Sequence, residues 1–246
     1  MTPDRPIPRA LEALWRNPDS GTRTRGLSRQ RIVEAAVEIA DSDGLAALSM
    51  ARLAERLGCG TMSLYRHVAN KDELVTFMVS AAPGPPPDPA ESAQWRHNLT
   101  DWAHGLWDVY HRHPWILEAA AGPPVDPGQL AWLDAGLATM GPTSLSEHDK
   151  LAAVMAILHF VRGSAALDLA AGAQHDAFDH PALLREFVDA DRHPALAAAL
   201  RAGVFDGADD RGADFRSGLR LILDGIATRL NEKTPAAERA YGGLSE

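Results

Sequence analysis

The segment Leu45–Leu74 constrains the fold of this chain most strongly, because its pattern predicts two short helices joined by a tight connection. Ser49 is a good N-cap, since its hydroxyl can accept hydrogen bonds from the unpaired amides of a first helical turn. Gly58 suits the left-handed residue that ends a helix, and Gly60 keeps the next connection short. Between these caps, three apolar residues share one helical face that suits a protein core: Leu53, Ala54 and Leu57.

A second short helix is predicted to begin at Thr61. Its apolar residues Leu64 and Val68 lie four positions apart and point inward. The outward positions carry short polar or flexible side chains that can reach base edges: Thr61, Met62, Ser63 and Arg66. Two helices joined by three or four residues that include glycine are typical of a helix-turn-helix motif. We therefore interpret residues 49–68 as a DNA-reading motif.

The same segment resembles the DNA-binding head of the TetR family of bacterial repressors. The resemblance covers residues 27–81 and is most specific in the runs Ser63–Val68 and Asn70–Leu74. It implies that Tyr65, His67 and Lys71 hold operator phosphates. Thr61, Met62 and Ser63 would lie toward the bases.

One position departs from the family pattern. Many members carry two adjacent basic residues in the first helix of the motif, whereas this chain has Ala51 before Arg52. The base contact of the first basic residue is therefore not carried over. We expect Arg52 to approach the bases and Ser49 to join the phosphate contacts.

The net charge of −9 argues at first against a nucleic-acid partner, because phosphate binding needs local positive potential. The charge is distributed unevenly, however. Residues 1–75 hold 11 basic and 10 acidic residues, a net charge of +1, and the other 171 residues carry −10. The predicted DNA-binding head can therefore present its cations locally.

The single cysteine, Cys59, excludes an intrachain disulfide and is expected to be a small packing residue rather than a redox sensor. The N-terminus lacks the apolar run of a signal peptide. The longest apolar stretch, Leu151–Val161, is far shorter than the roughly 20 residues that span a bilayer. We expect a soluble cytoplasmic protein, associated with the nucleoid when bound to DNA, with no membrane contact and no cofactor.

Residues 1–26 are expected to form a flexible N-terminal arm with one short helix at Arg9–Arg16. Arg23 and Arg25 could enter the minor groove or belong to a solvated basic tail. Residues 27–81 form the predicted head, in which Ser28 caps a bracing helix that ends at Gly44. The proline-rich residues 82–91 are expected to link the head to the body, as a spacer or as a stiff element that transmits movement.

Residues 92–232 are predicted to form a larger helical domain for effector binding and dimerisation, followed by a C-terminal tail at 233–246. Apolar residues recur at helical spacing in six ranges: 92–113, 126–140, 146–171, 181–190, 194–202 and 214–231. No segment alternates with period two. The sequence therefore predicts an all-α fold, a three-helix helix-turn-helix domain plus a larger α-helical domain.

Two of these helices, 146–171 and 214–231, carry small and apolar residues on more than one face. Small residues let helix backbones approach closely, so we expect the two helices of each subunit to form a four-helix dimer interface, a pairing that the resemblance also implies. The alternative is that both helices are central in a monomer. The interface residues expected are Ala152, Ala156, Gly163, Gly218, Leu219, Ile222, Gly225 and Ile226.

Five of the six tryptophans lie between Trp95 and Trp132, a density typical both of an apolar ligand cavity and of a well-packed core. Because family bodies usually enclose a cavity, we expect an effector site lined by Trp102, Leu106, Tyr110, Trp115, Met155, His159 and Phe160. His97, His104 and His111 recur every seven residues, about 10.5 Å along a helix, which is too far apart for one zinc ion. No metal site is expected.

The leading hypothesis is a homodimeric repressor that a small apolar effector releases from a palindromic operator. A constitutive or partner-controlled DNA-binding regulator without an effector is the first alternative. A helical-bundle enzyme that uses His159 is a remote one, because the chain has no nucleophile elbow, phosphate loop or metal-spaced cluster. We therefore expect no enzymatic activity.

Overall fold

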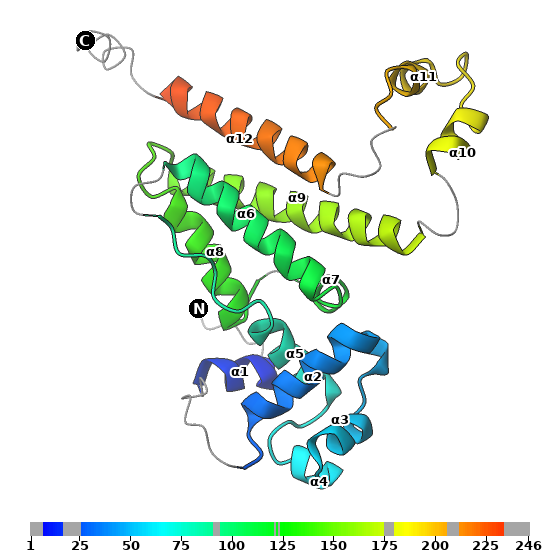
Figure 1. The fold of residues 1–246 in the computed structure, drawn as a ribbon. Coiled ribbons are helices and arrows are strands. Elements are labelled where there is room, and N and C mark those ends of the chain that lie inside the picture. Colours follow the sequence, from blue (N-terminus) through cyan, green and yellow to red (C-terminus); the bar gives the residue numbers. More distant parts are fainter. Residues whose placement is uncertain are drawn as a thin grey trace.

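The computed structural model describes residues 7–16, 26–90, 94–120, 122, 124–174, 180–205 and 212–233. These residues form helices and no strands, so the predicted all-α fold is confirmed (Figure 1). The elements are α1 (Arg9–Arg16), α2 (Arg29–Asp43), the 3₁₀ helix η1 (Leu45–Ala47), α3 (Met50–Leu57), α4 (Thr61–Leu64), α5 (Lys71–Ala81), α6 (Trp95–Arg112), α7 (Ile116–Ala119), α8 (Pro127–Thr139), α9 (Glu147–Gln174), α10 (His180–Phe187), α11 (Pro194–Arg201) and α12 (Ala213–Lys233).

Helices α1 to α5 form a head at one end of the molecule, with α4 at the end opposite α12 (Figure 1). Helix α2 packs on both α3 and α5. The apolar faces expected from the sequence meet in one core, in which Ile32, Ala36, Leu53, Leu64 and Leu74 are each fully buried. The helix-turn-helix pair is thus held rigidly from behind by α2 and α5.

Polar caps set the starts of the head helices. The hydroxyl of Ser28 accepts from the backbone N–H of Arg31 at 3.2 Å, and Ser49 accepts from that of Arg52 at 3.2 Å. Gly58 adopts the left-handed conformation with φ 65°, which L side chains disfavour. The expected caps are therefore present, and they place the turn between α3 and α4 where the glycines predicted it.

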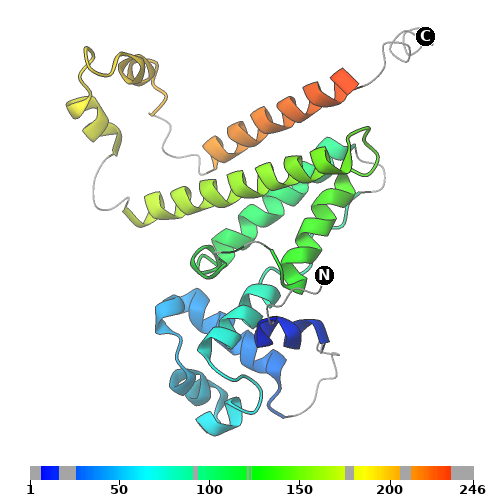
Figure 2. The same ribbon diagram turned by 180° about the vertical axis from the view of Figure 1, so that it is seen from behind.

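The body is a bundle in which α9 packs along α6, α8 and α12 (Figure 2). Val154, Ile157, Val161 and Ala165 of α9 are fully buried. Gly136 allows α8 to approach closely, because a Cβ there would lie 2.9 Å from atoms of both Trp102 and Val154.

Helical spacing predicts that Leu130, Leu133 and Leu137 of α8 and Leu151 of α9 face the core, and an apolar helix around His159 predicts a hydrogen-bonded core residue there; the structure differs at these positions. Leu130, Leu133 and Leu137 of α8 are half-buried, and Leu133 and Leu137 pack at the edge of the core, whereas Trp132, Gly136 and Thr139 are buried in it. Leu151, expected inside, is 42% exposed. His159, interpreted as a hydrogen-bonded core residue, is exposed, because α9 directs Val154, Ile157 and Val161 inward instead.

Two short elements, η1 and α7, were not predicted, because a single helical turn leaves no periodic pattern in the sequence. Helix α7 lies directly after Pro114 and carries buried Ile116 against the bundle. Trp115, at the start of α7, also contacts the head through Asp41. Helix α9 runs three residues beyond the predicted end at Ala171, and α10 ends three residues before Ala190.

The expected arm is partly folded onto the protein. Residues 9–16 form the predicted helix, but it packs on α5, and Trp15 donates its indole N–H to the backbone oxygen of Val125 at 3.2 Å. Apolar Leu14 and Ala13 explain this docking, since they pack against the core. Arg23, Arg25 and the tail beyond Lys233 lie outside the described residues.

Helix α9 is also long and apolar enough, by composition, to cross a membrane over residues Glu147–Gly172. Its place in the fold supplies another reason for this apolarity. One side of α9 lies in the bundle core, and the helix carries Arg162 and Asp168 in its second half. A central helix of a bundle needs the same composition.

Candidate nucleic-acid interface and cavity

Helix α4 and the turn behind it present the surface predicted to meet DNA. Met62 is 73% exposed, Tyr65 is 46% exposed, and Thr61, Arg66 and His67 are also exposed. Ser63 is half-buried, and Leu64 and Val68 fill the core beneath. The regular helix covers only Thr61–Leu64, and the backbone continues through a turn in which the N–H of His67 bonds the oxygen of Leu64 at 2.9 Å.

The residues expected to hold phosphates lie at the start of α3, in the turn after α4 and at the start of α5. Ser49 begins α3 and remains exposed, with its hydroxyl oxygen accepting from the Arg52 N–H. Lys71 begins α5 and is half-buried, with Nζ 3.5 Å from the backbone oxygen of Leu45. Asn70 caps α5 by accepting from the N–H of Glu73 at 2.8 Å, which fixes the start of the helix beside α4. At these positions the head presents a hydroxyl, a phenol, an imidazole and an ammonium group.

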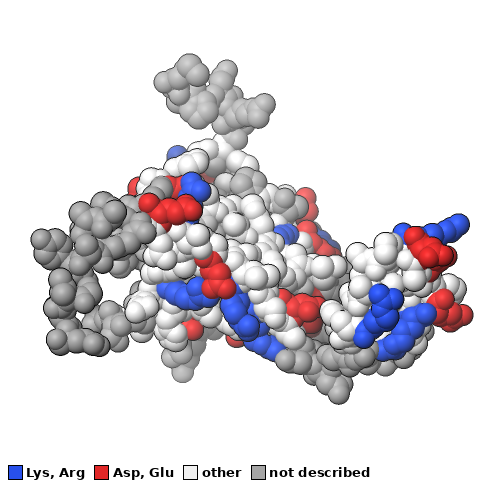
Figure 3. Space-filling view, turned by 90° about the horizontal axis from the view of Figure 1, so that it is seen from above, with Lys and Arg blue, Asp and Glu red and all other residues white. Residues whose placement is uncertain are grey.

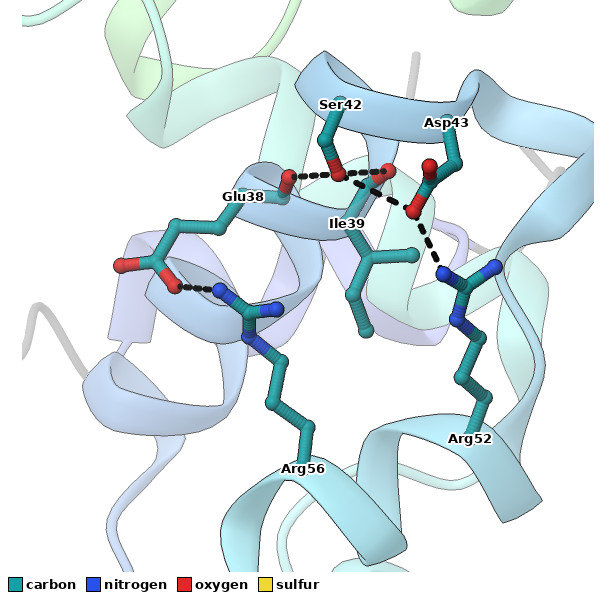
Figure 4. A network of polar contacts seen from close by, with 6 residues as sticks. All are labelled: Glu38, Ile39, Ser42, Asp43, Arg52 and Arg56. Atoms are coloured by element: carbon teal, nitrogen blue, oxygen red, sulfur yellow. Dashed lines mark hydrogen bonds and ion pairs between the residues drawn. The ribbon is translucent and has the colours of Figure 1, made fainter.

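Arg52 does not extend from the head as expected. Its guanidinium donates to Asp43 at 2.5 Å, and Arg56, one turn later, donates to Glu38 at 2.6 Å (Figure 4). Ser42 also donates to the Asp43 carboxylate at 3.1 Å. Both arginines of α3 are therefore turned toward α2, because the acids there lie within reach and neutralise them. Such ion pairs depend on a short distance in space between residues of different helices, so the linear sequence did not reveal them.

A cavity of about 410 Å³ lies where the head meets the body. Its walls come from the end of α5 (Val79), the linker (Pro83), α6, α7, α8 and α9. Thirteen of its 17 lining residues are apolar, and the four polar ones are Tyr110, Gln129, His159 and Arg162. Its volume and lining are those of a site for a small, largely apolar molecule.

Five of the seven residues expected to line an effector site do line this cavity: Trp102, Leu106, Tyr110, Met155 and His159. Trp115 instead points to the head, where its indole N–H donates to Asp41 at 2.7 Å. Phe160 packs against Gly218, whose absent side chain leaves room for the ring. The aromatic residues therefore have two roles: some line the cavity and others pack elsewhere in the protein. Only the fold shows which residue has which role.

The sequence reasoning missed Trp132, Gln129 and Arg162. Trp132 reaches the cavity from α8 and donates its indole N–H to the oxygen of Gly84 at 3.0 Å, which ties the linker to the body. Arg162 follows the apolar run of α9 directly, so a charge at the end of that run was the available signal. Its guanidinium donates to the backbone oxygen of Leu117 at 2.6 Å.

Tyr110 stands beside this arginine. Burial raises the pKa of the Tyr110 phenol above its ordinary value of 10.0, and the charge of Arg162 and its hydrogen bond partly counter that rise. The phenol therefore stays neutral at physiological pH. It adds a hydroxyl donor to the cavity without adding a negative charge.

Among the described helices, none covers one face of the body. Helices α9 and α12 lie side by side there (Figure 2). The view from above shows an uncharged area with groups of acidic and basic side chains beside it (Figure 3). Ala152, Ala156 and Gly163 of α9 are exposed, directly opposite the buried side of that helix.

The other expected interface residues divide between this face and the protein's own core. Gly225 is exposed, with nothing within 4 Å of where its Cβ would be. Leu219 and Ile226 are buried in the body, Ile222 is half-buried, and a Cβ on Gly218 would lie 2.4 Å from Phe160. Helix α12 therefore uses most of its apolar residues within the chain.

The histidines have separate partners. His97 lies 3.2 Å from Asp101, and His111 lies 2.8 Å from Asp168. His113 follows the last residue of α6, is buried, and donates to Asp41 at 2.8 Å. Within the described ranges no group of three His, Cys, Asp or Glu side chains is placed to hold a metal ion.

Comparisons with known proteins agree with this arrangement of head and body. Residues 32–76 match the family model of bacterial regulatory proteins of the tetR family. Residues 87–230 match the tetracyclin repressor-like C-terminal domain. Both descriptions are those of regulators rather than enzymes. The HTH-type transcriptional repressor DrrR1 of Streptomyces coeruleorubidus is 35% identical over 248 residues, covering 93% of this chain and 90% of that protein.

Solved structures share the fold. The TetR family protein ActR of Streptomyces coelicolor, in complex with (S)-DNPA, superimposes with a TM-score of 0.69 at 25% identity. That match covers 83% of this chain and 99% of the other. The complex of ActR with actinorhodin gives a TM-score of 0.70 at 26% identity, over 85% of this chain and 99% of the other.

Proposed function

The chain belongs to the TetR family of bacterial DNA-binding transcriptional regulators, and from this membership we propose the detail of its action. It is a homodimeric repressor of a near-palindromic operator, and a small, mainly apolar molecule in the cavity releases it. The protein acts in the cytoplasm, on nucleoid DNA.

The exposed helix α4 is the observation that carries this proposal. It lies at the free end of the head, with Thr61 and Met62 uncovered. A rigid short helix on a small head can enter a major groove, where its outward side chains meet base edges and flanking groups hold phosphates. Ser49, Tyr65, His67 and Lys71 supply those flanking groups.

The uncovered face of α9 and α12 supports a dimer. On α9 the small residues Ala152, Ala156 and Gly163 are exposed opposite the buried side, so a second copy can approach closely. Two heads then meet half-sites roughly 34 to 36 Å apart, the spacing of one helical turn of DNA. Gly225 on α12 extends the same contact.

The position of the cavity supports control by a small molecule. Its wall includes Val79 of the head helix α5 and Pro83 of the linker, so a bound molecule touches head and body together. ActR, a relative of similar fold, has been solved with two small molecules. A molecule that favours one arrangement of head and body changes the spacing of the two heads, and a coupling of about 1 to 3 kcal/mol weakens operator binding about 5- to 150-fold.

Operator binding is tested first by selecting genomic fragments that the purified full chain retains, and then by titrating the best fragment. Tyr65→Ala and Lys71→Ala should each weaken binding by about 10-fold or more, since each removes a hydrogen bond to a charged phosphate. Lys71→Ala should also reduce the slope of log K against log salt by about 1 per subunit. Arg201→Ala, an equal loss of charge on the distant α11, should change neither quantity. Unchanged affinity in both head variants would contradict this assignment.

The dimer is tested by sedimentation at micromolar concentration. Ala156→Glu places a charge in the small-residue face of α9 and should yield monomers. Ala131→Glu, on the exposed side of α8, should leave the dimer intact. A monomeric wild-type chain would refute the pairing.

A further inference from the structure

The charged side chain that lines the cavity is positive. Arg162 is the cavity's cationic residue, and none of the described residues that line it is Asp or Glu, although the whole chain carries a net charge of −9. A ligand without charge could use the apolar walls and the neutral polar groups, but it would leave Arg162 without a counter-charge. The position of Arg162 suggests that the ligand carries a negative charge.

Arg162 differs from those arginines of the head and body helices that pair with acids. Arg52, Arg56, Arg96 and Arg229 each lie within 3.0 Å of a carboxylate. In the described part of the chain, Arg162 has no carboxylate partner, and its hydrogen bonds go to the backbone oxygen of Leu117 and to the phenol of Tyr110. A guanidinium has five N–H donors, so donors remain for a ligand.

Arg162 is half-buried, so the lack of a negatively charged partner carries a cost in free energy. A cation that is partly removed from water loses hydration that neutral acceptors replace only in part. A carboxylate accepts two parallel hydrogen bonds from a guanidinium, which is the strongest pairing available to it, and an ionised phenol accepts a charge-assisted hydrogen bond through its single oxygen. The Leu117 oxygen fixes one NH₂ group and thereby orients the remaining donors.

We propose that the effector is an aromatic molecule with an anionic oxygen, whose ring system lies against the indoles of Trp102 and Trp132 and whose anion pairs with Arg162. This inference rests on the proposed effector role of the cavity and adds the chemical class of its ligand. Tyr110, which stays neutral, donates its hydroxyl proton to the same anion. Gln129 lies in the same wall and supplies a further amide donor.

The test compares two probes that differ only in charge, anthracene-2-carboxylate and anthracene-2-carboxamide, by titration calorimetry with the full chain. The wild type should bind the carboxylate about 10-fold or more tightly than the carboxamide. Arg162→Met keeps an unbranched apolar stem without the guanidinium and should bring the ratio of the two affinities close to 1. Arg112→Met, at the exposed end of α6, is the matched control and should keep the wild-type ratio.

The ratio separates ligand recognition from a structural role for Arg162. A merely structural arginine would change the affinities for both probes together and leave their ratio unaltered. Equal affinities in the wild type, or a preference that survives in Arg162→Met, would overturn the proposal. In those cases release of the operator by the neutral carboxamide would still uphold the proposed function, whereas a cavity ligand that never alters operator binding would refute the function itself.

Discussion

The indole Nε1 of Trp115 lies 2.7 Å from the Oδ1 atom of Asp41, and this hydrogen bond joins the body to helix α2 of the head. His113 donates to the same oxygen at 2.8 Å. Ile116, which follows Trp115 in the chain, lines the cavity, and the backbone oxygen of Leu117 accepts a hydrogen bond from Arg162. A continuous series of contacts therefore runs from the cavity to the head through the first turn of α7.

Loss of this hydrogen bond should weaken communication more than folding. Trp115→Phe keeps an aromatic ring but removes the N–H, so operator affinity without effector should change little. The loss of affinity that effector causes should shrink by about 2- to 30-fold, which corresponds to about 0.5 to 2 kcal/mol of coupling. Fluorescence anisotropy with labelled operator measures both. Trp15→Phe, which removes another bond between head and body, is the control, and an equal effect there would argue against a specific role for Trp115.

The ion pair between Arg52 and Asp43 should limit DNA affinity. Asp43→Asn removes the negative charge that holds the guanidinium on α2, so Arg52 becomes free to meet a phosphate or a base. We expect tighter operator binding, by about 3- to 10-fold, and a steeper salt dependence, by about 1 per subunit at most.

Glu34→Gln provides the comparison for this variant, because it removes one negative charge from the same helix without freeing an arginine. Glu34 bonds Gln30 at 2.9 Å. If both variants tighten binding equally, the gain comes from net charge and Arg52 is not the cause.

The crossing of α5 and α8 depends on Gly128. A Cβ there would lie 1.9 Å from the backbone oxygen of Ser80, and its N–H bonds the Ser80 hydroxyl at 3.2 Å. Gly128→Ala should therefore push the two helices apart and lower the free energy of unfolding by about 1 to 3 kcal/mol, measured by urea titration. Ser80→Ala removes only the hydrogen bond and should cost less than about 1.5 kcal/mol. A larger loss of stability in Ser80→Ala than in Gly128→Ala would show that the close approach of the two helices does not determine the stability of this crossing.

Tyr110 should make the protein sensitive to alkali. Its pKa is raised above 10.0 by burial, so the native state holds the phenol proton more tightly than the unfolded chain does. The resulting stabilisation is complete below pH 10 and is lost as the pH rises through the pKa of the folded state. Tyr110→Phe should lose less stability than the wild type over that range, which melting curves between pH 8 and 11 compare. Parallel curves for the two proteins would contradict the prediction.

Local chemistry explains most of what the sequence predicted. The caps at Ser28 and Ser49, the glycine at 58 and the inward Leu64 act within one or two turns of chain, so their effect can be recognised without knowing the fold. The same holds for the exposed residues of α4, because helical periodicity alone assigns inward and outward positions. The family resemblance rested on these local features.

What the sequence by itself determined, then, is the succession of helices, the helix-turn-helix head and the apolar character of the body. Only the tertiary structure decided that Arg52 faces Asp43, that Trp115 serves the head rather than the cavity, and that Arg162 enters the cavity without a carboxylate. The physical reason is range. Caps and periodicity act between neighbours in the chain, whereas ion pairs, cavity walls and helix crossings join residues whose separation in sequence carries no information about their distance in space.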